Sequence, residues 1–128
     1  MSRHLLATAL VLPLAFSTAP IAAQAPQVDL PNLSMEQRAA LRCGVAFGLI
    51  AKGQAEGDPR AAAYPPMEPR GREFFVRTMA QLMDEEGLTR DQVNRLAFDT
   101  TMELTKEAPA AREKMMPTCL LMLEASGL

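Results

Sequence analysis

The chain has 128 residues, a formal net charge of −2, no tryptophan and a single histidine, His4. Mild acidity without a basic face or aromatic platforms excludes nucleic acid as an expected partner. The scarcity of histidine excludes serine–histidine and cysteine–histidine nucleophiles, histidine-based zinc sites and haem held by histidine. We therefore predict a protein that is not an enzyme and carries no cofactor or metal.

Residues 1–23 have the three parts of a secretory signal peptide: an arginine near the start, an apolar run over residues 5–16, and small residues after it. Cleavage after Ala23 is favoured, and cleavage after Ala25 is the alternative. The apolar run is too short to cross about 30 Å of hydrocarbon, and Pro13 interrupts it. We expect a periplasmic or secreted protein without stable membrane insertion.

Residues 24–33 are polar and contain two prolines, which predicts an extended leader. Residues 34–128 should form one helical domain. Its first helix begins at a capping box, Ser34 to Gln37, and should end near Gly57. The apolar residues of this helix cover two adjacent faces, so it needs partners on more than one side. They are Ala39, Leu41, Cys43, Val45, Ala46, Phe47, Leu49 and Ile50.

Two glycines, Gly44 and Gly48, lie four residues apart within this first helix. Each costs about 1 kcal/mol of helix propensity relative to alanine. A close approach by another backbone is the expected compensation, because glycine lacks the side chain that keeps helices apart. The same spacing dimerises membrane helices, but Arg42 and Lys52 flank it here.

Prolines at four positions prevent a continuous helix in the connection that follows, residues 57–71. A connection of this length is either a structural wrap across the surface or a binding loop, and we favour the wrap. Tyr64, which precedes two of the prolines, is expected to cover the core.

A second helix is predicted over residues 72–86, with Gly87 as its stop and Leu88 packing back. Its apolar rows contain Phe74, Phe75, Val76, Met79, Leu82 and Met83. A second capping box, from Thr89 to Gln92, starts the third helix at once, so the two helices should form a hairpin.

The third helix should end before Pro109 and bury the face that carries Val93, Leu96, Ala97, Thr100 and Leu104. The fourth helix should begin at Pro109 or the next residue. Pro117 removes one of its hydrogen bonds, which predicts a kink or a division of the helix.

The fold class that follows is all-α: a single small domain of about four helices around a central first helix. The two cysteines, Cys43 in the first helix and Cys119 in the last, are predicted to form a disulfide in an exported chain. A loop of that length gives roughly 4 kcal/mol of stabilisation in the chain-entropy account. Two buried free thiols are the alternative.

Two further clusters are candidate sites that we interpret as structural. Asp84, Glu85, Glu86 and Asp91 lack the order of a calcium loop and are interpreted as a solvated helix end. Thioether and thiolate ligands select cuprous copper, but methionine also fills irregular helical cores. We favour core packing for the sulfur cluster, which comprises Met115, Met116, Cys119 and Met122.

The stretches ALRCGVAFGLIAKGQ, REFFVRTMAQLMDEEGLT and CLLMLEASGL resemble those of short exported helical proteins of Gram-negative bacteria that carry no assigned function. The resemblance covers most of the chain after the signal and implies no activity. A looser similarity, in architecture only, is to periplasmic acid-stress chaperones, which are also small, helical and closed by one disulfide.

The sequence therefore favours a non-enzymatic periplasmic or secreted helical protein that binds another protein, as a stress or envelope accessory factor. Methionine-rich helix faces suit adaptable binding surfaces. The alternative is a carrier that holds a small apolar ligand between the first, second and fourth helices. Its lining would comprise Phe47, Phe74, Phe75 and Met79.

Overall fold

The computed structural model describes residues 32–128. The predicted signal peptide and residues 24–31 of the leader lie outside the described residues. The described chain is all-α, as predicted, and forms a single domain of four α-helices and one short 3-10 helix. In chain order these are α1 (Met35–Glu56), η1 (Ala61–Ala63), α2 (Arg70–Glu86), α3 (Arg90–Lys106) and α4 (Pro109–Ala125).

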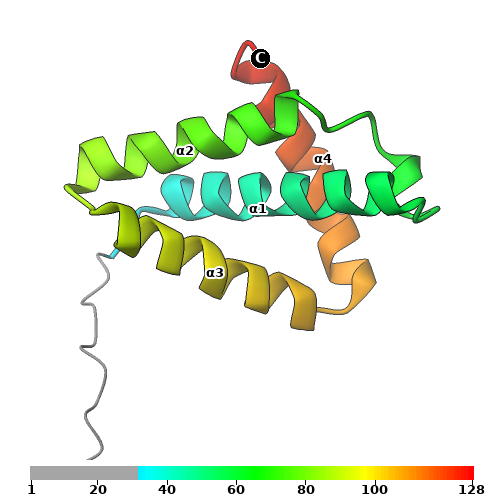
Figure 1. The fold of residues 1–128 in the computed structure, drawn as a ribbon, viewed down its shortest axis with the longest axis horizontal. Helices are drawn as coiled ribbons and strands as arrows, with labels where there is room; N and C mark the ends of the chain where they lie inside the picture. Colours follow the sequence, from blue (N-terminus) through cyan, green and yellow to red (C-terminus); the bar gives the residue numbers. More distant parts are fainter. Residues whose placement is uncertain (1–31) are drawn as a thin grey trace, which may run out of the picture.

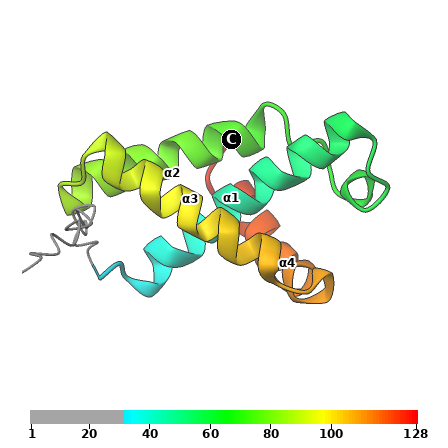
Figure 2. The same cartoon turned by 60° about the horizontal axis from the view of Figure 1, so that its bottom comes forward.

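Helix α1 is the centre of the domain and contacts all three other α-helices and η1. In Figure 1 it runs between α2 and α3, while α4 crosses behind it. Figure 2 shows α3 passing across α1 at an angle. The wide apolar surface predicted for the first helix is therefore used against several partners, and Phe47 in its middle is completely buried.

The predicted capping box begins α1. The Ser34 side chain accepts a hydrogen bond from the Gln37 amide at 3.1 Å, and the Ser34 amide donates to Gln37 Oε1 at 2.8 Å. Leu33, just before the cap, is buried in the core. At the other end Gly57 takes the left-handed conformation with φ of 77°, which closes the helix.

Gly44 and Gly48, two of the three glycines of α1, have different environments. A Cβ on Gly44 would lie 3.2 Å from the Cα of Phe75, tighter than most contacts of a Cβ atom, so glycine lets α2 approach α1 closely there. A Cβ on Gly48 would meet no heavy atom within 4 Å. The prediction of a close backbone contact is thus confirmed at Gly44 and wrong at Gly48, because α2 crosses α1 one turn before Gly48.

Helix α2 begins two residues earlier than predicted, at Arg70. Its buried row is Gly71, Phe74, Thr78 and Leu82, whereas Val76, which we placed in an apolar row, is 59% exposed. Thr78 is accommodated in this row because its hydroxyl donates to the carbonyl oxygen of Phe74 at 2.9 Å.

One side chain of α1 makes four hydrogen bonds to the backbone of the connection from α1 to α2. Gln54 Nε2 lies within hydrogen-bonding distance of three carbonyl oxygens, of Ala61, Tyr64 and Pro65, at 2.9–3.2 Å. Gln54 Oε1 accepts from the amide of Met67 at 3.0 Å. The Met67 side chain is completely buried and Tyr64 packs against the core. The connection is thus a structural wrap that supplies core residues.

The hairpin of α2 and α3 forms as predicted. Gly87 ends α2 in the left-handed conformation, Leu88 is buried, and Thr89 caps α3 through a second capping box with Gln92. Helix α4 begins at Pro109 and continues to Ala125, with Pro117 inside it. Pro117 does not divide the helix. It lies on the exposed face, where water can hydrogen-bond to the carbonyl that loses its donor.

The predicted disulfide joins α1 to α4. Cys43 and Cys119 are bonded, with their Cα atoms 5.1 Å apart, and both residues are buried. The bond closes a loop with a sequence separation of 76 residues. The disulfide fixes the position along α1 at which α4 crosses it. The thioether sulfur of Met122 lies 3.8 Å from Cys43 Sγ, so this methionine packs against the bond.

Candidate binding groove

The four residues predicted to line an apolar ligand site are not gathered around one cavity. Phe47 and Phe74 pack edge to face in the core, with ring centroids 5.3 Å apart. Phe75 is half-buried against Gly44 and faces a separate shallow depression along α1. Met79 is half-buried beside the core. Of the four, Phe74 also lines a groove of the described domain that lies between α1, α2 and α4.

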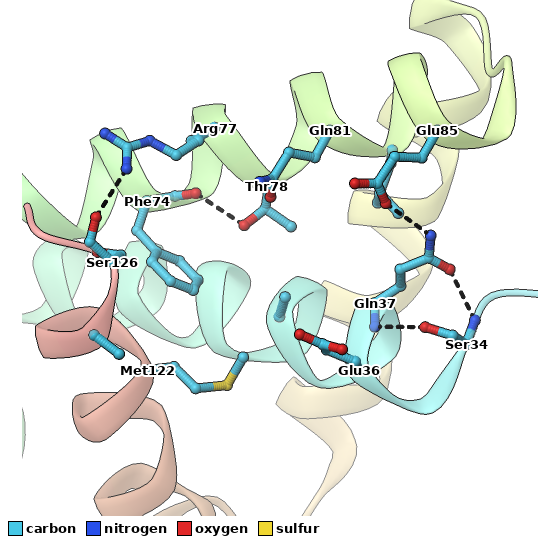
Figure 3. Close-up of a pocket in the computed structure, with 13 residues that line it drawn as sticks. Ser34, Glu36, Gln37, Phe74, Arg77, Thr78, Gln81, Glu85, Met122 and Ser126 are labelled. Atoms are coloured by element: carbon cyan, nitrogen blue, oxygen red, sulfur yellow. Dashed lines mark hydrogen bonds between the residues drawn. The ribbon is translucent and has the colours of Figure 1, made fainter.

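This groove, which we call the α2 groove, lies where the start of α1, the middle of α2 and the end of α4 meet (Figure 3). Its volume is about 600 Å³ and it opens to solvent. The lining comprises Ser34, Glu36, Gln37 and Ala40 of α1 and its cap, Phe74, Arg77, Thr78, Gln81, Leu82 and Glu85 of α2, and Met122, Ala125 and Ser126 of α4 and its cap.

The groove has an apolar floor. Phe74 and Leu82 are buried in the core, and Ala40 and Met122 are half-buried against it. Thr78, also on the floor, has its hydroxyl committed to the Phe74 carbonyl. A ligand in the groove would therefore meet carbon rather than hydrogen-bonding groups at its base, and polar recognition has to come from the rim.

The rim on the α2 side is a row of three exposed side chains of different charge. Arg77, Gln81 and Glu85 follow one another at intervals of four residues, so they project from the same side of α2, one per turn. At a rise of 1.5 Å per residue, Arg77 and Glu85 are about 12 Å apart along the helix. The groove therefore has a basic end and an acidic end, and Glu36 of α1 adds a second carboxylate to its lining.

The acidic end is positioned by Gln37. Its Oε1 completes the capping box of α1, and its Nε2 donates to Glu86 Oε1 at 2.6 Å and to Glu85 Oε2 at 3.2 Å. One side chain thus joins the start of α1 to the end of α2 (Figure 3). It still leaves carboxylate oxygens of Glu85 for another donor, because a carboxylate accepts several hydrogen bonds.

The basic end is positioned by the end of α4. Arg77 donates from one guanidinium nitrogen to the Ser126 carbonyl at 3.0 Å. Arg70, two turns earlier, donates to the Leu128 carbonyl at 2.7 Å and pairs with Glu124 at 2.9 Å. The two arginines thus donate to oxygens at the C-cap of α4 and beyond it, which have no partners within the helix.

Helix α2 carries its charges against its own dipole. Its first half is basic and its last turn is acidic, whereas a helix by itself favours the opposite order. The neighbouring helix ends provide the compensation. The arginines face the negative C-terminus of α4, and the glutamates face the positive N-terminus of α1. The same arrangement gives the groove its two charged ends.

Sequence reasoning did not identify Gln37, Arg77, Gln81 and Glu85 as a set. It interpreted the acidic run only as a solvated helix end. The interval of four from Arg77 to Gln81 to Glu85 was a visible signal. What the sequence lacked was the position of α4, which determines that this side of α2 borders a groove.

No protein-family model matches the chain, and no curated protein or solved structure matches it either. Within residues 32–128, no helix is both long enough and apolar enough to cross a membrane. In that same range, no three histidine, cysteine, aspartate or glutamate side chains come together as a metal-binding group.

Proposed function

We propose that this is a non-enzymatic, exported protein that binds a segment of another polypeptide in the α2 groove. The observation that supports it is the combination of an apolar floor with a rim of exposed side chains, at the meeting point of three helices. An apolar base with a few polar groups placed around it is the usual composition of a binding site. The rim would orient the bound segment, and the floor would bury its apolar side chains.

The periplasmic or secreted location is part of the proposal. It is supported by the Cys43–Cys119 disulfide, because such bonds persist in oxidising compartments, and by the signal-like pattern of residues 1–23. Thiol titration and intact-mass analysis of protein recovered from the periplasm check both points. We expect no free thiol and a chain that begins at Gln24. Two titratable thiols or an intact Met1 would contradict the location.

Photo-crosslinking tests the binding function in living cells. A photoreactive residue in place of Gln81 should give an adduct with a polypeptide at neutral or acidic pH. The same residue in place of Glu73, which is exposed on α2 but does not line the groove, is the matched control. Filling the groove with Ala125→Phe should remove the Gln81 adduct. Equal adducts from both positions, or none from Gln81, would argue against the function.

Carriage of a small apolar ligand is the second candidate, and it has less support. Phe47 and Phe74 fill the core with each other, which leaves no space between them for a ligand. A pocket bordered by Leu49, Ile50, Tyr64 and Met116 has a volume of about 220 Å³, below the usual range for ligand sites of roughly 300–1,000 Å³. Titration with a fluorescent apolar probe tests this candidate, and saturable binding that Met116→Trp abolishes would favour it.

A further inference from the structure

The α2 groove has dimensions and charges that restrict which polypeptide segment it can accept. We propose that its occupant is an extended segment with one acidic and one basic side chain four residues apart and apolar side chains between them. This inference rests on the proposed binding function and adds the chemistry of the partner. Three observations lead to it: the width of the groove, the spacing of its charged ends, and the polarity of its floor.

The width of the groove favours an extended segment over a helix. Gln37 on one side and Glu85 on the other, which both line the groove, are joined by a hydrogen bond of 3.2 Å, so the two sides stand within side-chain reach of each other at that end. A helix with its side chains is about 10–12 Å across. An extended chain occupies only about 4.8 Å in the direction of its backbone hydrogen bonds. A single strand therefore fits the groove better than a helix does.

The spacing of the charged ends sets the interval in the partner. Arg77 and Glu85 are eight helical residues apart, about 12 Å. In an extended chain, residues i and i+4 are about 13 Å apart and project from the same side. An acidic side chain at one of these positions meets Arg77 while a basic one at the other meets Glu85. An interval of two residues spans only about 7 Å and cannot reach both.

Successive side chains of an extended chain point to opposite sides, which matches the rim and the floor of the groove. Side chains at i+1 and i+3 point away from the charged pair, toward Phe74, Leu82 and Met122 on the floor. The residue at i+2 lies level with Gln81, whose exposed amide offers a donor and an acceptor. The expected pattern is therefore acidic, apolar, any residue, apolar, basic. It fits in either chain direction, because side chains alone provide the match.

The test uses blocked nine-residue peptides with a fluorescent label and measures binding by anisotropy at low salt. One peptide has the sequence Asp-Val-Gln-Val-Lys at its centre. Two comparison peptides carry aspartate or lysine at both charged positions, and a fourth has the two charges only two residues apart. We expect the first peptide to bind about tenfold more tightly than the others, a ratio that exposed ion pairs account for and that added salt reduces.

Charge reversal in the protein should change the preference. Arg77→Glu makes both ends acidic, so the peptide with two lysines should become the tightest ligand. Glu85→Lys should favour the peptide with two aspartates. The matched controls are Arg72→Glu and Glu73→Lys, which make the same charge changes on exposed positions of α2 outside the groove lining. They should keep the preference for mixed charges. Thermal unfolding of each variant verifies that it is folded, and the two reversals provide independent tests.

The outcomes separate this inference from the function on which it rests. Equal binding of all four peptides, with binding lost in Ala125→Phe, would overturn the charge pattern and leave polypeptide binding in the groove intact. Binding of none of the peptides at millimolar concentration would overturn both. A preference that shifts equally in the control variants would show that net charge, rather than the groove, selects the peptide.

Discussion

The two connections that precede and follow α2 show two ways in which a short helical chain fixes a change of direction. The connection from α2 to α3 has three residues, Gly87, Leu88 and Thr89, and every one has a local role. The connection from α1 to α2 spans residues 57–69, and besides local hydrogen bonds it is held by Gln54, which lies in the preceding helix. The first is specified by neighbours in sequence and the second by a tertiary contact.

The first prediction concerns the core residue of the long connection. Met67→Ala should lower the free energy of unfolding by about 3 kcal/mol, because it removes a completely buried side chain and leaves a cavity. Urea unfolding followed by circular dichroism measures it. Met35→Ala, at a position that is 83% exposed, is the control and should change stability by less than about 0.5 kcal/mol. Equal effects at the two positions would show that the long connection contributes nothing to the core.

The second prediction concerns Gln54. Gln54→Ala should cost about 2 kcal/mol, because the Met67 amide loses its acceptor and three carbonyls lose a shared donor. Hydrogen exchange at the Met67 amide provides a local measurement, and its protection should fall much more than that of amides in α3. Gln81→Ala, which removes an exposed glutamine, is the matched control. Unchanged protection of Met67 in Gln54→Ala would contradict the tertiary role.

These two connections also show how much the sequence could predict. The helix caps at Ser34 and Thr89 and the stops at Gly57 and Gly87 were predictable because each signal lies within a few residues of its effect. The role of Gln54 was not predictable, because its partners lie seven to thirteen residues further on. The prolines of the connection do not by themselves determine the course of the chain to these partners. The burial of Met67 depends on the same path.

Features within the helices and the groove also differ in whether neighbouring residues or tertiary contacts determine them. Gly44 and Gly48 are equivalent in sequence, and only the position at which α2 crosses α1 distinguishes them. The pairing of Cys43 with Cys119 was predictable because no other cysteine exists. The groove was not predictable, because its existence depends on where α4 ends against α2, and this follows from the crossing that the disulfide fixes.

The third prediction concerns the two glycines that end α1 and α2. It tests whether they contribute equally to stability. Gly57 and Gly87 both have positive φ, 77° and 65°, and a Cβ at either position would meet no heavy atom within 4 Å. Alanine at either position should therefore cost only the backbone strain of the left-handed conformation, about 1–2 kcal/mol. Urea unfolding should give equal losses for Gly57→Ala and Gly87→Ala. A difference greater than about 1 kcal/mol would show that the connection, and not the glycine, determines the helix end.

The fourth and smallest effect is expected at the cap of the short connection. Thr89→Ala should cost about 1 kcal/mol, because the Gln92 amide loses its acceptor while the rest of the hairpin is unchanged. Thr89→Ser keeps the hydroxyl and should retain most of the stability. The loss should be confined to the first turn of α3, where hydrogen exchange can resolve it, because the capping box involves only residues of that turn. A loss that also reached the Met67 amide would mean that the two connections are coupled through α2, and the distinction between a locally and a remotely specified turn would then fail.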